Sequence, residues 1–220
     1  YIFVKILIVL KNFIKELEWR GMLQDFIPGC EDQLLEKSRS GYIGFDPTSD
    51  SLHIGSLVQI LILMHFQQCG HKPFVLVGGA TGMIGDPSGK SNERNLLSQD
   101  DLNKNIKGIH KQLSKFLNFD SDNTNSAVLC NNNDWFKNIN LINFIRDTGK
   151  FITVNYMIAK ESVKKRLSKD SSVGMSFTEF SYQLIQAYDF YYLFSKMNCL
   201  IQMGGSCLLY TSPSPRDLTA

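Results

Sequence analysis

The chain lacks the features that mark several protein classes. Its five cysteines are odd in number, widely spaced and free of any Cys-x-x-Cys pair, which argues against a disulfide framework or a zinc ribbon and favours a reducing compartment. The net charge is only +2, so bulk electrostatics do not indicate a nucleic-acid-binding protein. The apolar run at residues 1–10 is about half as long as a membrane-spanning helix. We therefore expect a cytoplasmic protein without a membrane partner.

One group of potential metal ligands stands out, namely His65, Cys69 and His71. Positions four apart share one face of a helix, but a structural zinc site needs four ligands and no fourth lies nearby. The same helix also needs its apolar residues to pack on a sheet. We therefore predict that this group binds no metal.

The composition, with 43% hydrophobic and 20% charged residues, is that of one globular domain. Residues 1–11 begin without Met, and no basic segment precedes their apolar run as in a signal peptide, so we interpret them as a non-native leader. Residues 207–220 show neither helical nor strand periodicity and contain two Ser-Pro steps, so we interpret them as a non-native tail. The predicted domain covers residues 12–206.

Hydrophobic periodicity predicts alternating strands and helices. The expected strands are residues 42–45, 73–77, 128–130 and 200–203, and the expected helices are residues 12–25, 31–37, 54–69, 102–117, 141–147, 155–167 and 177–194. The strand, helix and strand within residues 42–77 predict a right-handed crossover between parallel strands, with the turns after both strands at one edge of the sheet. The fold class is therefore α/β with a Rossmann-like parallel sheet.

Two turns at that edge indicate a nucleotide site. The His53-Ile54-Gly55-Ser56 turn opens a helix, whose first N–H groups and positive dipole favour phosphate. The loop at residues 78–90 is rich in glycine, which lets a substrate approach the backbone. It is not a Walker loop, because only three residues separate Gly85 from Gly89, and the even spacing of its glycines does not fit G-x-G-x-x-G.

Five segments carry a specific resemblance. They are Gly44-Phe45-Asp46-Pro47-Thr48, Ser51-Leu52-His53-Ile54-Gly55, residues 78–90, Val154-Asn155-Tyr156-Met157 and Ser176-Phe177-Thr178-Glu179-Phe180-Ser181-Tyr182. Together they resemble the bacterial-type tyrosyl-tRNA synthetases, a family of class I aminoacyl-tRNA synthetases, from about residue 12 to residue 206. The resemblance implies an incomplete catalytic domain with a helical insertion that forms a homodimer.

The resemblance also implies the reaction. The carboxylate of tyrosine attacks ATP, pyrophosphate leaves, and the tyrosyl group of the adenylate passes to tRNA(Tyr). ATP enters as a substrate with Mg²⁺, and no tightly bound cofactor is expected. No protein nucleophile is needed, so catalysis depends on positioning and on charge stabilisation at the α-phosphate.

The resemblance assigns the ATP side of the site to the two turns. Thr48 and His53 would contact phosphates, Gly55 would let the adenine lie against the backbone, and Ser56 would reach the ribose. Gly44, Asp46 and Gly204 would complete the ATP-binding set. Lys90 and Arg94 would close over the departing pyrophosphate, although loop cations are often ordinary solvated charges.

The tyrosine side is assigned in the same way. Tyr42 and Asp189 would hold the phenol, although a core aromatic is the ordinary role for Tyr42 alone, whereas a carboxylate on an apolar helix needs a partner. The substrate ammonium would meet Asp86, Tyr182 and Gln186, although an Asp before Pro is also common in turns. Thr81 and Asn132 would line the same pocket.

The sequence departs from the family after Ser206, where Cys207 and Leu208 replace a polar pair, and no second signature loop follows. We therefore expect the chain as given to be nearly inactive. Two alternatives remain open: a non-catalytic RNA-binding or splicing cofactor derived from the synthetase core, and a tryptophan-specific relative. The cationic residues Lys160, Lys164, Lys165, Arg166 and Lys169 could touch the tRNA acceptor stem, but such a cluster is more typical of a solvated helix end.

Overall fold

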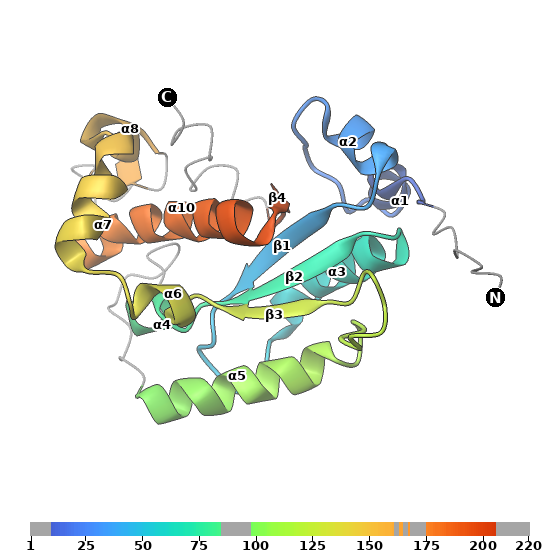
Figure 1. The fold of residues 1–220 in the computed structure, drawn as a ribbon, viewed down its shortest axis with the longest axis horizontal. Helices are drawn as coiled ribbons and strands as arrows, with labels where there is room; N and C mark the ends of the chain where they lie inside the picture. Colours follow the sequence, from blue (N-terminus) through green and yellow to red (C-terminus); the bar gives the residue numbers. More distant parts are fainter. Residues whose placement is uncertain (1–9, 85–97, 161–162, 165–166, 168–174, 206–220) are drawn as a thin grey trace, which may run out of the picture.

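The computed structural model describes residues 10–84, 98–160, 163–164, 167 and 175–205. Their centre is a four-stranded parallel sheet in the order β3-β2-β1-β4 (Figure 1). The strands are β1 Ser40–Phe45, β2 Lys72–Val77, β3 Val128–Asn131 and β4 Cys199–Gln202. The parallel pairing confirms the predicted fold class. It also brings the carboxyl ends of all four strands to one edge of the sheet.

Alternate residues of each strand face opposite sides of the sheet, as the period of two requires. On β1 and β2, Ile43, Val75 and Val77 belong to one buried cluster, whereas Tyr42 and Phe74 belong to another. Helices cover both faces, which is why the strands read as continuous apolar runs.

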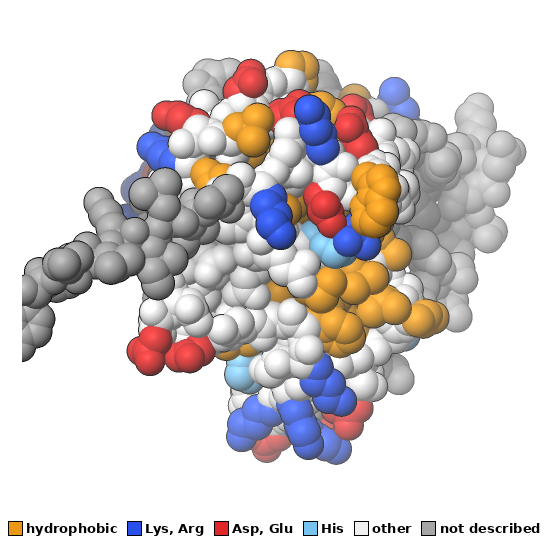
Figure 2. Space-filling model, turned by 90° about the vertical axis from the view of Figure 1, so that its right-hand side faces the viewer, with side chains coloured by type: hydrophobic (Ala, Val, Ile, Leu, Met, Phe, Trp, Pro, Cys, Tyr) orange, Lys and Arg blue, Asp and Glu red, His pale blue; other side chains and the backbone are white. Residues whose placement is uncertain are grey.

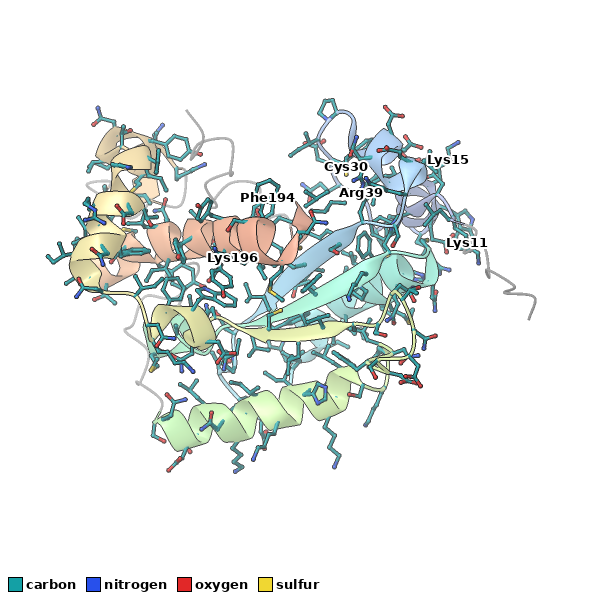
Figure 3. All side chains as sticks on the ribbon, in the orientation of Figure 1. Lys11, Lys15, Cys30, Arg39, Phe194 and Lys196 are labelled. Atoms are coloured by element: carbon teal, nitrogen blue, oxygen red, sulfur yellow. The ribbon has the colours of Figure 1, made fainter. Side chains whose placement is uncertain are left out.

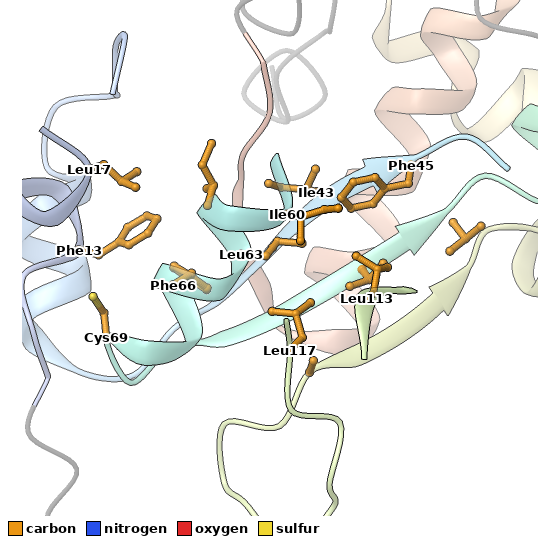
Figure 4. Packing of buried hydrophobic residues seen from close by; sticks show 14 of the residues in the cluster. Phe13, Leu17, Ile43, Phe45, Ile60, Leu63, Phe66, Cys69, Leu113 and Leu117 are labelled. Carbon is orange, nitrogen blue, oxygen red and sulfur yellow. The ribbon is translucent and has the colours of Figure 1, made fainter. Parts of the chain in front are cut away.

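The first face is covered by α1 Phe13–Trp19, α3 Leu57–Gln68 and α5 Gln99–Leu113. Figure 4 shows Ile60 and Leu63 of α3 beside Ile43 and Phe45 of β1, and Phe13 of α1 beside Phe66 at the other end of α3. Phe66 lies at the centre, with no exposed surface, and its ring is in edge contact with Phe13 at 5.0 Å between centroids. Beside α1 lies α2 Cys30–Glu36, and Arg39 donates hydrogen bonds to Gln33 and Glu36 there (Figure 3).

The second face is covered by α10 Phe177–Met197 and the short α6 Asn133–Phe136. Beyond α6, the chain forms α7 Leu141–Asp147, η2 Gly149–Phe151 and α8 Val154–Ala159, which lie at the N-terminal end of α10 in Figure 1. Within the described ranges, no helix combines the length and apolar character needed to cross a membrane.

The predicted elements are largely confirmed, but several details were wrong; among the boundaries, the helix predicted over residues 102–117 spans Gln99–Leu113 and the one predicted over 177–194 ends at Met197. The first helix ends at Trp19 instead of residue 25, because Gly21 adopts a φ of +65° that stops it. The helix predicted over residues 155–167 is interrupted, since Lys160 is extended after α8. The described part of the glycine-rich loop contains a helical turn, α4 Thr81–Ile84. The helix expected from residue 54 begins as a 3₁₀ turn, η1 Ile54–Ser56, and its Ile54 is 82% exposed, not buried.

Candidate active site

Polar side chains from the loops after β2 and β3 and from helix α10 meet at the carboxyl edge of the sheet, and Asn132 connects them. This residue follows β3 and is 1% exposed. Its Oδ1 accepts a hydrogen bond from the Ala80 backbone N–H at 2.7 Å, which ties the β3 loop to the β2 loop. Its Nδ2 donates to Thr81 Oγ1 at 3.2 Å and to Asp189 Oδ2 at 3.1 Å. The Asn132 amide therefore has a partner at both ends, which fixes its orientation.

Asp189 is a carboxylate buried within α10, with 3% of its surface exposed. Its second oxygen accepts a hydrogen bond from Trp135 Nε1 at 2.9 Å. Burial raises the pKa of Asp189 to about 7, against the hydrogen bonds from Asn132 and Trp135, which lower it, while Asp46 raises it further. A buried carboxyl group whose pKa lies near neutral pH is typical of a functional site.

Tyr42 lies in β1 beside this carboxylate and is 3% exposed. Its ring packs at 5.5 Å from the ring of Phe190. Burial raises the pKa of Tyr42 well above its ordinary value, and the nearby Asp189 and Cys199 raise it further. Gln202 lies close enough to lower this pKa, but its side chain does not form a hydrogen bond with the Tyr42 hydroxyl. Among the described residues the Tyr42 hydroxyl therefore has no hydrogen-bond partner, which is costly for a buried donor.

Open space adjoins this pair. Gly44 lies on the same side of β1 as Tyr42, because the two positions are two residues apart. A Cβ at Gly44 would meet no atom within 4 Å, whereas one at Gly78 would overlap Thr81 Oγ1. The strand surface at Gly44 is thus free to receive a ligand, while the absence of a side chain at Gly78 lets Thr81 fold back toward Asp46.

The predicted residues of α10 share one face of that helix. Tyr182, Gln186 and Asp189 are spaced by four and three, so they point to the same side. Tyr182 is 8% exposed, and the same helix buries Gln183, whose Oε1 has no partner within the described residues. The structure therefore brings Tyr182 and Gln186 to the helix face that carries Asp189.

The predicted ATP residues lie along the turns after β1 and β4. Thr81 Oγ1 donates to Asp46 Oδ1 at 3.5 Å, and the Thr48 N–H donates to the Asp46 carbonyl at 2.9 Å. His53 is exposed and precedes η1, where its Nδ1 accepts from the Gly55 N–H at 2.9 Å. In the neutral ring this leaves the proton on Nε2, as a donor for an anionic ligand.

Ser56 and Gly204 are both half-buried, at the start of α3 and just after β4. Asp86, Lys90 and Arg94, which were also predicted for the site, lie outside the described residues. Their roles stay predictions.

Sequence reasoning missed the side chains that support the predicted ones. Trp135 donates a hydrogen bond to Asp189, and Gln202 lies near Tyr42. Trp135 could have been found from the sequence, because it lies three residues after the predicted site residue Asn132. Nothing local marked Gln202, which reaches Tyr42 only through the pairing of β4 with β1.

A second concave surface lies away from this edge. It is a shallow groove lined by residues of α1 and of the C-terminal half of α3, among them Trp19, Met64 and His65. Figure 2 shows hydrophobic side chains gathered near a histidine on this side of the molecule. None of the predicted site residues lines the groove.

Comparisons with known proteins agree with the geometry at the carboxyl edge. A tyrosine–tRNA ligase of Flavobacterium psychrophilum is 61% identical over 197 residues, and one of Parabacteroides distasonis is 63% identical over 195 residues. These alignments cover 90% and 89% of this chain but only 46% and 45% of the relatives. The chain thus spans about half the length of the curated relatives it matches.

Solved structures give the same result. A C-terminally truncated mitochondrial tyrosyl-tRNA synthetase of Aspergillus nidulans has a TM-score of 0.77 and 31% identity, covering 90% of this chain and 58% of that chain. A tyrosyl-tRNA synthetase of Archaeoglobus fulgidus complexed with L-tyrosine, with a TM-score of 0.54 and 16% identity over 92% of this chain and 62% of that chain, shows the fold alone. A family model described as "tRNA synthetases class I (W and Y)" matches residues 36–206. Because this match covers most of the chain, the chain belongs to the class I tRNA synthetases for tryptophan and tyrosine.

Proposed function

We propose that the chain carries the tyrosine-activating site of a tyrosine–tRNA ligase, whose substrates are tyrosine, ATP and tRNA(Tyr). The curated relatives that bear this name are 58–63% identical to it. One observation of the structure supports tyrosine as the amino-acid substrate. A buried carboxylate, Asp189, lies near a buried hydroxyl, that of Tyr42, which has no hydrogen-bond partner among the described residues.

A phenol suits this pair because it is both a donor and an acceptor. In the proposed complex the substrate hydroxyl donates to Asp189 and accepts from Tyr42. Phenylalanine offers the Tyr42 hydroxyl no acceptor and Asp189 no additional donor, and a buried hydroxyl left unpaired costs about 1–3 kcal/mol. The indole of tryptophan can donate to Asp189 but offers Tyr42 no acceptor in the ring plane. The pair therefore favours tyrosine over both alternatives.

The remaining amino-acid contacts follow from position. Tyr182 and Gln186 lie on the Asp189 face of α10, and together with Asp86 they are proposed to receive the substrate ammonium. Thr81 and Asn132 belong to the network that orients Asp189. Their proposed role is to keep the carboxylate aimed at the phenol.

The ATP side is proposed along the turns at the same edge. The proposed ATP-binding residues are Gly44, Asp46, Thr48, His53, Gly55, Ser56 and Gly204. The tyrosine carboxylate attacks the α-phosphorus, the bond to the pyrophosphate oxygen breaks, and pyrophosphate leaves with Mg²⁺. Lys90 and Arg94 are proposed to stabilise the charge on the leaving group, so positioning and electrostatics supply the catalysis.

Amino-acid binding to this chain tests the proposal. Calorimetry should show tyrosine binding more tightly than phenylalanine or tryptophan. Asp189→Asn should weaken tyrosine binding by about 1.5–3 kcal/mol, or roughly 10- to 150-fold, while changing phenylalanine binding little. Asp25→Asn, an exposed aspartate outside the site, is the matched control. If tryptophan bound more tightly than tyrosine, the chain would be a tryptophan-specific member of the family. If it bound RNA but no amino acid, a non-catalytic RNA-binding role would be favoured.

A homodimer is also proposed. Exposed apolar side chains concentrate on α7 and α10, where Leu141 and Ile142 are each 68% exposed and Phe177 is 82% exposed. Apolar surface gathered in this way is typical of a protein interface. Light scattering should find a dimer for the chain and a monomer for Ile142→Glu, with Trp19→Glu on α1 as the control. A monomeric parent chain at high concentration would contradict the proposal.

We propose a cytoplasmic location because the described cysteines form no disulfide bonds. Cys30, Cys69, Cys130 and Cys199 are all free thiols in the described part of the chain. Free thiols in this number are typical of reducing compartments.

A further inference from the structure

The segment between β1 and η1, residues 46–53, carries Thr48 and His53, and two of its backbone hydrogen bonds are short-range. The Thr48 N–H donates to the Asp46 carbonyl, and the His53 carbonyl accepts from the Ser56 N–H. Figure 1 shows the chain leaving β1 and running down to α5 before it rises again into α3. The helix α5 therefore lies where it can hold this segment.

Three residues of α5 contact the segment in order along its length. Asn105 Nδ2 donates to the Pro47 carbonyl at 2.9 Å, and this amide is 8% exposed. Gly108 lets the helix approach so closely that a Cβ there would overlap the Asp50 carbonyl oxygen. At the far end, Gln112 makes a two-way contact with Leu52.

The Gln112 contact uses both ends of the side-chain amide. Oε1 accepts from the Leu52 N–H at 2.8 Å, and Nε2 donates to the Leu52 carbonyl at 3.3 Å. This arrangement copies the pairing that a neighbouring strand would give to Leu52. It fixes the backbone of the residue immediately before His53.

The three positions form one line on the helix. Residues 105, 108 and 112 are separated by three and four, so they share a face, and that face lies next to the apolar line of Leu102, Ile109 and Leu113 that packs on the sheet. Packing against a neighbouring segment does not require two amide side chains on this face, because amides on a half-buried helix face need polar partners. Their partners are all backbone groups of residues 47–52.

We propose that α5 positions the ATP-binding turn: Asn105, Gly108 and Gln112 hold residues 47–52 so that Thr48 and His53 stand where the phosphates of ATP bind. This inference rests on the proposed function for the ATP contacts. The three residues are positioning residues, because each acts through the backbone of the turn. Mobility at this turn would lower the effective concentration of both phosphate ligands, so its restraint contributes to binding.

Gln112→Met tests the proposal, because methionine keeps the volume and removes both hydrogen bonds. We expect the Leu52 amide to exchange its hydrogen at least about tenfold faster, and the Kd for ATP to rise about tenfold, which corresponds to about 1.4 kcal/mol. The Kd for tyrosine should stay within about twofold, since Asp189 and Tyr42 lie on the other face of the sheet. Gln99→Met, an exposed position on the same helix, is the matched control and should change neither quantity.

Two further variants keep the test decisive if Gln112→Met folds poorly. Gln112→Glu retains the acceptor for the Leu52 N–H but not the donor, so it should recover part of the loss in ATP affinity. Gly108→Ala pushes the turn away at Asp50 and should weaken ATP binding while leaving tyrosine binding unchanged.

The outcomes separate the two proposals. An unmodified chain that binds tyrosine but no ATP overturns the ATP half of the proposed function. An unmodified chain that binds ATP, with Gln112→Met and Gly108→Ala binding it equally well, overturns the positioning role alone. Faster Leu52 exchange without loss of ATP affinity also overturns it, because the turn would then be held for the fold and not for the ligand.

Discussion

The two faces of the central sheet are formed by alternate residues of the same strands, yet they bury different chemistry. On the face covered by α3 and α5, Ile43 and Val75 pack among aliphatic and aromatic side chains. On the face covered by α10, Tyr42 keeps a hydroxyl without a partner among the described residues, and Asp189 keeps a buried carboxylate. The first arrangement stabilises the fold, whereas the second costs free energy in the absence of a ligand.

This difference shows how one sheet can be a scaffold on one face and carry a candidate site on the other. A parallel sheet is buried on both faces, and here the first face is mostly apolar. The second face can then carry polar groups near its carboxyl edge, where the loops supply Asn132 and Thr81 as partners. Local rules of packing are broken where a substrate is proposed to bind, which is where such exceptions are expected.

Truncation on the first face should have the largest effect. Phe66→Ala should lower the free energy of unfolding by about 3–5 kcal/mol, because the fully buried ring contacts Phe13 and His71 and leaves a cavity. Phe194→Ala is the control: this residue lies on α10 (Figure 3) and is 50% exposed, so its loss should cost less than about 1 kcal/mol. Urea denaturation measures both. Equal losses would mean that the α3 face is not the main source of stability.

The same contrast shows what the sequence could and could not predict. The first face was predictable, because Val75, Val77 and the apolar line of α5 follow strand and helix periods. Asp189 could also be predicted as a candidate site residue, since a lone carboxylate on an aromatic helix needs a polar partner. The hydrogen bond between Asp189 and Trp135 was not predictable, because the two residues are 54 positions apart and meet only when α6 packs against α10.

Boundaries set by single residues were equally hard to predict. The apolar pattern after Trp19 continues through Met22 and Leu23, so periodicity alone extended α1 past the point where Gly21 ends it. The apolar pattern placed residue 54 at the start of a helix, but a 3₁₀ turn, η1, stands there and leaves Ile54 exposed to solvent. Both errors come from backbone geometry that the hydrophobic pattern does not encode.

A pH series should reveal the cost of burying Asp189 on the second face. The pKa of Asp189 is about 7 in the folded chain and near 3.8 when unfolded, so between these values the folded chain holds a proton that the unfolded chain has released. The free energy of unfolding should therefore fall as pH rises from about 4 to about 7, by at most roughly 4 kcal/mol. Asp189→Asn should remove this decrease. A variant whose pH profile matched that of the parent chain would show that Asp189 is not the titrating group.

His71 should give a smaller effect of opposite sign from the first face. Its ring is fully buried and stacks on Phe66 at 4.7 Å, and its Nδ1 accepts from the Arg39 N–H at 3.3 Å, so a proton there would break that bond. Burial lowers the pKa of His71 from 6.5 to about 4. Between these two pH values the unfolded chain binds a proton at His71 that the folded chain does not, so the free energy of unfolding rises with pH, by at most roughly 3 kcal/mol.

The two titrations overlap in pH, so the parent chain alone shows only their difference. In the Asp189→Asn background the His71 contribution stands alone, and the free energy of unfolding should increase from about pH 4 to about pH 6.5. Adding His71→Gln should flatten that increase, as measured by urea denaturation at several pH values. If Asp189→Asn instead still lost stability with rising pH, the first face would not hold a neutral histidine, and the contrast between a scaffold face and a site face would rest on packing alone.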